Sequence, residues 1–292
     1  MRYAISNWIY GDEPLRRTFE RLSRYGYQGI ELVGEPGRYS LPEVRALSAE
    51  FGIPVASVLS WGIWGIPGRD LASPDEGERA AALRYEEACV DLAASLGAPF
   101  LVVLPAPAGR TAPTGRPTAE AEWKAGFARE WALAVDSLRR LAGYAAKNGI
   151  VLALEPINRY ETFMVTNVDQ ALRFLEEVGT SNLKLHLDTF HMNIEEADPA
   201  AAIRRAGDLV VNMHLSDSNR ETPGRGHTDF AAMLRALTGI GYEGVLALEP
   251  VPPGSDALLA SAMSEAMPLR DIYAEEGIRY LKQCEAGLGD MP

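Results

Sequence analysis

The sequence predicts a single (β/α)8, or TIM, barrel that spans residues 1–292. Short apolar runs alternate with longer amphipathic patterns about eight times along the chain. Such alternation is typical of parallel strands joined by right-handed helical crossovers. Eight units in 292 residues suit one closed barrel, because barrels of this kind have about 250 residues. No linker divides the series, and no G-x-G-x-x-G motif follows an early strand, which disfavours a dinucleotide-binding fold.

The expected elements follow one another in a regular order. Apolar runs of four to eight residues predict buried strands, and these runs are 3–6, 26–33, 55–60, 100–104, 150–154, 183–187, 209–214 and 244–249. Helical patterns cover 14–25, 41–51, 74–96, 120–148, 167–178, 199–206, 230–240 and 264–284. Ser73 is the expected cap of the third helix. Glycines just before four strands, at positions 26, 97, 149 and 241, suit helix C-caps.

Composition and charge exclude several classes of protein. The net charge of −12 argues against a nucleic-acid partner, because binding to phosphates depends on clustered Lys and Arg. The start of the chain has no basic flank before a long apolar run, so no signal peptide is expected. No apolar run approaches the ~20 residues of a membrane helix. With only two cysteines, the chain is expected to be cytoplasmic, with no membrane partner.

Four of the later strands end in a residue that can bind a metal or a proton. The run 150–154 stops at Glu155, 183–187 stops at Asp188, and the next two runs end at His214 and Glu249. In a (β/α)8 barrel the C-terminal ends of the strands form the active site. For any one of these residues alone, a structural role is the more common explanation: a helix N-cap or solvated loop residue for Glu or Asp, and a hydrogen-bonded core histidine for His214. The pattern shared by four consecutive strands predicts a metal site.

The residue types indicate which ion such a site would hold. Two Glu, one Asp and one His form an oxygen-rich ligand set that suits Mn²⁺, Mg²⁺ or Co²⁺ better than a structural zinc. The chain has four histidines, which are too few for a trinuclear centre. His186 lies on the opposite strand face from Leu185 and Leu187, and we assign no role to it.

A second set of polar residues lies on the loops just beyond the predicted ligands. Glu161 follows Glu155 by six residues, His191 follows Asp188 by three, and Arg220 follows His214 by six. Each is expected within reach of a molecule bound at the metal, although loop salt bridges would explain them equally well.

The motifs around these residues resemble the ketose 3-epimerases of the D-tagatose and D-psicose (D-allulose) 3-epimerase type, in the xylose isomerase-like TIM-barrel superfamily. The resemblance is carried by DTFHMNIEE at 188–196, LALEPINRYE in the fifth unit and HLSDSNRETPGRG in the seventh. It covers most of the chain and is strongest from 150 to 250. The loops 61–69 and 105–118 depart from the family pattern, so substrate identity is the least transferable property.

The resemblance implies a role for each candidate residue. Glu155, Asp188, His214 and Glu249 would bind one divalent ion, commonly Mn²⁺. Glu161, His191 and Arg220 would contact the hydroxyl groups of a small sugar. Glu155 and Glu249 would also act as the acid/base pair that inverts C3 of a free ketose through an enediolate. A homodimer or homotetramer is also implied.

Other functions remain open from the sequence. An aldose–ketose isomerase of the hydroxypyruvate or inosose type would use the same metal ligands. An apurinic-site nuclease on a related barrel is disfavoured by the few histidines and the acidic balance. A non-catalytic sugar-binding barrel would be favoured if Glu155 or Glu249 were replaced, and both are present.

Overall fold

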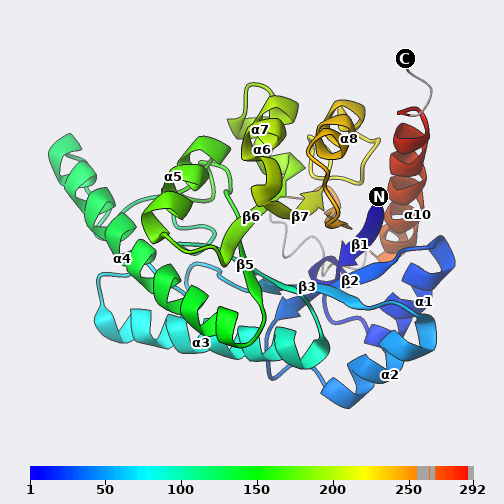
Figure 1. Cartoon of the computed structure of the whole chain (residues 1–292), viewed down its shortest axis with the longest axis horizontal. Helices are drawn as coiled ribbons and strands as arrows, with labels where there is room; N and C mark the ends of the chain where they lie inside the picture. The colour runs from blue at the N-terminus through cyan, green and yellow to red at the C-terminus, as the bar shows by residue number, and fades with distance from the viewer. Residues whose placement is uncertain (255–262, 264–266, 289–292) are drawn as a thin grey trace.

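Eight parallel strands close into a barrel in the order of the sequence, which confirms the predicted fold (Figure 1). The structure is a computed structural model that describes residues 1–254, 263 and 267–288. The strands are β1 (Arg2–Ser6), β2 (Gly29–Gly34), β3 (Val55–Ser60), β4 (Phe100–Val103), β5 (Val151–Leu154), β6 (Leu183–Asp188), β7 (Val210–Leu215) and β8 (Val245–Leu248). β1 pairs with β8 as well as with β2, and this pairing closes the barrel.

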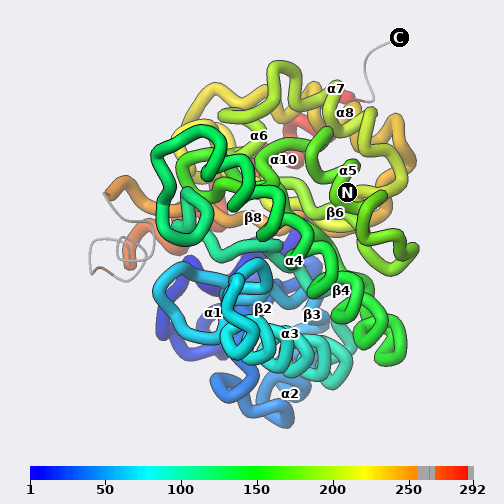
Figure 2. The backbone as a smooth tube through the Cα atoms, turned by 90° about the vertical axis from the view of Figure 1, so that its left-hand side faces the viewer, coloured from blue at the N-terminus to red at the C-terminus, as the bar shows by residue number. Residues whose placement is uncertain are grey.

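The helices follow one another around the outside of the strands (Figure 2). They are α1 (Leu15–Tyr25), α2 (Leu41–Phe51), α3 (Glu76–Leu96), α4 (Glu120–Lys147), α5 (Val168–Val178), α6 (Thr189–Glu195), α7 (Pro199–Ala206), α8 (Phe230–Gly239) and α10 (Met267–Ala286). Two short 3₁₀ helices, η1 (Asn7–Tyr10) and η2 (Gly207–Leu209), adjoin β1 and β7. No helix of the described part is long and apolar enough to cross a membrane.

Local sequence explains where most of these helices end. Gly26 and Gly97 adopt left-handed conformations at the C-caps of α1 and α3, with φ of 77° and 71°, as predicted. The prediction was wrong by one residue for the other two glycines, because the C-caps of α4 and α8 are Asn148 and Ile240, which directly precede Gly149 and Gly241. The predicted cap of α3 was wrong. Asp75, not Ser73, is the N-cap, because its side chain accepts from the backbone N of Glu78 at 2.9 Å.

The structure also adds a helix that the sequence analysis did not predict. α6 starts at the residue after β6, and the Asp188 side chain accepts from the backbone N of Phe190 at 2.7 Å. No loop separates the strand from the helix, so the apolar run and the helical pattern merge in the sequence. The last helix was expected from residue 264, but 264–266 lie outside the described residues.

Buried apolar strands bring the functional residues together at one end of the barrel. β8, with the sequence VLAL, is buried along its whole length, and β5 and β4 are nearly so. In parallel sheets that are covered on both faces, strands are expected to be apolar throughout. A polar residue at the last position of such a strand is therefore held at a fixed place by the core beneath it.

Helix α3 carries a buried carboxyl group that makes stability depend on pH. Glu86 is 2% exposed, and its Oε2 makes no hydrogen bond to a described residue. Burial raises its pKa from 4.5 to about 8. Because the pKa is higher in the folded state, the protonated form favours folding, and stability falls as pH rises from about 4.5 to about 8.

We expect Glu86→Gln to remove this dependence. The variant should melt several degrees above the wild type at pH 9, at roughly 2–4 °C per kcal/mol, and should gain nothing at pH 4.5. Thermal unfolding monitored by circular dichroism at both pH values measures the difference. Glu76→Gln, at an exposed site of the same helix, is the matched control. An equal Tm difference at the two pH values would contradict the assignment.

Candidate metal centre and substrate pocket

The four predicted metal ligands converge at the C-terminal end of the barrel. His214 Nδ1 lies 3.2 Å from Glu249 Oε2 and 3.8 Å from Glu155 Oε1. Asp188, His214 and Glu249 form one group whose ligand atoms all lie within 4.8 Å of one another. Glu155 forms two overlapping groups of the same size, one with His186 and His214 and one with Asp188 and His191.

The donor atoms of this cluster suit a divalent cation. Glu155, Asp188 and Glu249 are at most 5% exposed. His214 is 1% exposed, and its Nδ1 makes no hydrogen bond to a described residue although it faces two carboxylates. Buried carboxylates are stabilised when they are paired or coordinate a metal. Ligand atoms around a small divalent ion are roughly 3–4 Å apart for bonds of about 2.0–2.2 Å, and the spacing here is compatible with that.

Glu31 fixes the orientation of His214, and the sequence analysis gave it no role. Its Oε1 lies 2.6 Å from His214 Nε2, and its Oε2 accepts from Ser57 Oγ at 2.6 Å and from Asn212 Nδ2 at 3.3 Å. Burial raises the pKa of Glu31, but His214 and the hydrogen bonds outweigh burial and lower it. An ionised carboxylate only accepts, so Nε2 carries a proton, and Nδ1 is the ring nitrogen that would bind a metal in place of its own proton. Such carboxylate–histidine pairs are typical behind metal ligands.

We expect Glu31→Gln to weaken metal binding by roughly 10–100-fold, because the charge that orients and polarises His214 is lost. Isothermal titration of the metal-free protein with Mn²⁺ measures the change. Glu35→Gln, which alters a partly exposed pair with Arg69 at the end of the same strand, is the matched control. Unchanged affinity in Glu31→Gln would show that the pair does not support a ligand.

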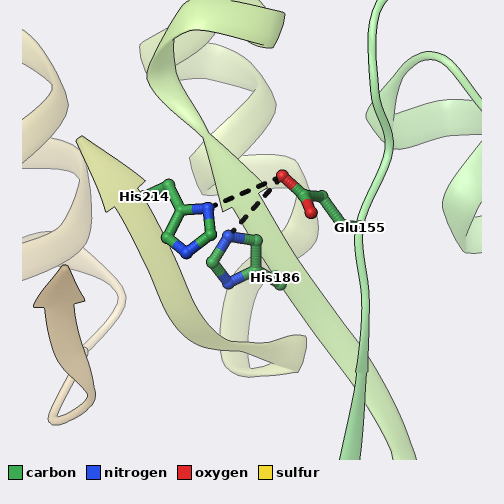
Figure 3. Close-up of side chains that lie close together, drawn as sticks. All are labelled: Glu155, His186 and His214. Atoms are coloured by element: carbon green, nitrogen blue, oxygen red, sulfur yellow. Dashed lines mark ion pairs between the residues drawn. The ribbon is translucent and has the colours of Figure 1, made fainter. Parts of the chain in front are cut away.

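His186 lies beside this cluster, whereas the sequence analysis assigned it no role (Figure 3). The strand face opposite Leu185 and Leu187 points into the barrel. There His186 Nε2 lies 3.8 Å from Glu155 Oε1, and the ring packs edge-on against His214 with centroids 4.1 Å apart. Neither ring nitrogen makes a hydrogen bond to a described residue. Burial and the charge of His214 hold the pKa of His186 well below 6.5, so the ring is neutral.

The charges of the cluster act differently on its two glutamates. Burial raises the pKa of Glu155, and His214 only partly opposes this effect. Burial also raises the pKa of Glu249, but the charges of His214 and Arg220 outweigh this effect and lower the pKa to about 2. Burial lowers the pKa of His214, yet Glu249 and Glu31 raise it well above 6.5. The pKa of Glu155 is therefore raised and that of Glu249 lowered, although both glutamates lie beside His214.

The other predicted residues also reach the site. Arg220 donates to Asp188 Oδ2 at 2.8 Å and to Glu249 Oε2 at 2.7 Å, so its guanidinium bridges two predicted ligands. Its backbone has φ of 67°, an uncommon left-handed conformation that turns the side chain toward the site. Glu161 and His191 line the same pocket. The structure thus brings together all seven residues that the sequence singled out.

The pocket above the cluster has a polar floor and an apolar wall. Its volume is about 680 Å³. The apolar side is lined by Trp8, Leu59, Trp61, Ile63, Leu104 and Val251. Trp8, which the sequence analysis missed, donates its indole N–H to Glu249 Oε1. Trp8 lies outside every motif that the sequence analysis used, so the sequence did not indicate this hydrogen bond.

A (β/α)8 barrel with a carboxylate–histidine cluster at the C-terminal ends of its strands defines a class of metal-dependent barrel proteins. Within that class, the family described as xylose isomerase-like TIM barrel matches residues 19–284, and the chain belongs to this family.

Named relatives within the family are epimerases. The chain is 44% identical to D-psicose 3-epimerase of Enterocloster bolteae over 41% of this chain and 40% of the relative. It is 32% identical to L-ribulose 3-epimerase of Mesorhizobium japonicum over 85% of this chain and 80% of that relative. A crystal structure of D-allulose 3-epimerase from Methylomonas sp. with D-allulose has a TM-score of 0.81 and 28% identity, and covers 97% and 96% of the two chains. These relatives support an enzyme of the isomerase class.

Proposed function

We propose that this protein is a divalent-metal-dependent epimerase that inverts C3 of a free ketose through an enediolate. The observation that carries the proposal is the convergence of Glu155 and Glu249 on one pocket, where both also belong to the candidate metal cluster. The names of the relatives supply the substrate class, because D-psicose and L-ribulose are ketoses.

The two glutamates suit an acid/base pair. They follow β5 and β8, strands that are three positions apart around the barrel, so their carboxylates approach the pocket from different directions. Inversion requires one group that removes the C3 proton and another that returns a proton to the opposite face of a planar intermediate. Glu155 and Glu249 would exchange these roles when the reaction runs backwards.

The cluster would hold the metal through Glu155, Asp188, His214 and Glu249. A bound divalent ion supplies positive charge next to the sugar oxygens, which stabilises negative charge that develops on them. We propose Mn²⁺ as the ion, with Co²⁺ or Mg²⁺ able to replace it, because the donors are mostly oxygen atoms.

Three further side chains would hold the sugar. Arg220 places its guanidinium across Asp188 and Glu249 and would orient sugar oxygens that bind beside these two carboxylates. His191 Nε2 lies 3.7 Å from Asp188 Oδ2 and 3.9 Å from Glu155 Oε1, close enough to contact an oxygen bound between them. Glu161 would accept a hydrogen bond from a hydroxyl group. Fixed contacts of this kind keep C3 between the two carboxylates.

The lining of the pocket favours a sugar without phosphate. Arg220 is the only Lys or Arg that lines it among the described residues, and two carboxylates already occupy its guanidinium. Phosphate sites depend on Arg or Lys side chains or on free backbone N–H groups. The apolar wall suits the carbon skeleton of the sugar.

Other properties complete the proposal. We propose that residues 1–292 form one domain, that the protein works in the cytoplasm, and that it forms a homodimer or homotetramer.

Product analysis tests the proposed function. The Mn²⁺-loaded protein is incubated with D-tagatose, D-fructose and L-ribulose, and the products are separated by chromatography. The expected product from at least one sugar is its C3 epimer. An aldose product would show instead an aldose–ketose isomerase at the same site, and no product from any of the three would refute the proposal.

A further inference from the structure

Asn158 lies between two of the residues that face the sugar pocket. It is 1% exposed and belongs to the loop that follows β5. Its Nδ2 lies 2.8 Å from Glu161 Oε1 and 2.8 Å from His191 Nδ1. Its Oδ1 accepts from the backbone N of Tyr160 at 3.0 Å, and its own backbone N donates to His191 Nδ1 at 3.3 Å.

The neighbouring groups determine the orientation of the Asn158 side-chain amide. The Glu161 carboxylate accepts hydrogen bonds, and the backbone N–H of Tyr160 donates one. The Asn158 NH₂ group must therefore face Glu161, and its oxygen must face Tyr160. The opposite orientation would place oxygen against oxygen on one side and two donors against each other on the other side.

The amide orientation determines where the proton of His191 resides. Both the NH₂ group and the backbone N–H of Asn158 point at His191 Nδ1, and both are donors. Nδ1 must accept, so the neutral ring carries its proton on Nε2. Nε2 is 3.7 Å from the nearest oxygen of Asp188 and 3.9 Å from that of Glu155. These separations exceed a hydrogen bond, so the N–H remains available to a bound molecule.

We propose that Asn158 is a positioning residue that holds His191 as an Nε2–H donor and aligns Glu161 as an acceptor through the same amide group. A donor and an acceptor at fixed places would then contact neighbouring oxygens of the sugar. The sugar contacts rest on the proposed function, whereas the tautomer of His191 does not. One buried amide thus sets two side chains, one from the loop after β5 and one from helix α6.

Nitrogen NMR of the histidine rings tests the tautomer directly. The Mg²⁺-loaded protein is used, because Mg²⁺ is diamagnetic, with ¹⁵N-labelled histidine at pH 7.5. The chain has four histidines, and His191→Gln identifies the signals of His191. We expect His191 to have an unprotonated Nδ1 and a protonated Nε2. A proton on Nδ1, or on both nitrogens, would overturn the proposal whether or not the protein is active.

Two variants test the positioning role. Asn158→Asp replaces the NH₂ group that faces His191 Nδ1 with a carboxylate oxygen, which accepts a hydrogen bond. His191 should therefore acquire a proton on Nδ1, and kcat/KM for the best ketose should fall roughly 10–100-fold. Asn158→Ala should lose activity to a similar extent. Mn²⁺ affinity should change little in either variant, because the hydrogen bonds of Asn158 within the described residues go to Glu161, His191 and Tyr160 and not to the four proposed ligands.

A matched control separates positioning from general loss of stability. Asn182 also bonds through its side chain, but to the backbone oxygens of Ile150 and Ala142 at the other end of β5. Asn182→Ala should lower the Tm without changing the tautomer or kcat/KM. Normal kcat/KM in Asn158→Asp would overturn the positioning role. A wild type with the expected tautomer that converts no ketose would refute the proposed function and leave the assignment of the His191 proton standing.

Discussion

Glu155→Gln and Glu249→Gln are each expected to lower the rate of C3 epimerisation by about 10³–10⁴-fold. Glutamine has nearly the same shape but cannot take up a proton, so each variant lacks one of the two groups that act at C3. Steady-state kinetics at saturating Mn²⁺ measures the effect, so that weaker metal binding does not account for the loss. Glu177→Gln on the outer helix α5 is the matched control and should keep full activity.

Solvent exchange distinguishes an acid/base pair from two metal ligands. In D₂O each variant keeps one glutamate and can still remove the C3 proton that faces it. We therefore expect slow deuterium uptake into one C3 epimer only, and into the opposite epimer for the other variant. Equal uptake into both epimers by either variant would contradict the two-base assignment.

Removing the metal should have the second large effect. A chelator is expected to abolish turnover, and added Mn²⁺ should restore it. The Tm should also fall, because carboxylates that remain buried without a cation repel one another. Ligand at 100 times its Kd stabilises by about 2.7 kcal/mol, which corresponds to roughly 5 °C or more. Differential scanning calorimetry with and without Mn²⁺ measures the shift.

The double variant Glu155→Gln/Glu249→Gln is the control for this experiment. With two of the four proposed ligands neutralised, Mn²⁺ should no longer raise its Tm. A wild-type protein whose activity and Tm are both insensitive to the chelator would show that the cluster does not hold a functional metal.

The sequence predicts the barrel and the position of the site because both depend on local patterns. Runs such as VLAL at 151–154 and 245–248 are buried in the structure as strands, and the residues that directly follow them, Glu155 and Glu249, lie at one end of the barrel. A charged residue after a fully apolar strand is visible without any three-dimensional information, and parallel topology then brings such residues together.

Contacts between distant strands leave no such pattern. Glu31 supports His214 from 183 positions away, and it sits within a strand rather than at its end. Alternation in β6 shows that His186 faces away from Leu185, but only the closed barrel shows that this face is the interior. Asn158 lies within the motif LALEPINRYE, yet its role depends on His191 in helix α6, 33 positions away.

Deuterium incorporation by the wild type tests the central claim most directly. The Mn²⁺-loaded protein is incubated in D₂O with D-tagatose, D-fructose or L-ribulose, and the position of deuterium is determined by NMR. Proton removal at C3 predicts deuterium at C3 of the sugar together with formation of the C3 epimer. Deuterium at C1 or C2 with an aldose product, and none at C3, would contradict the account.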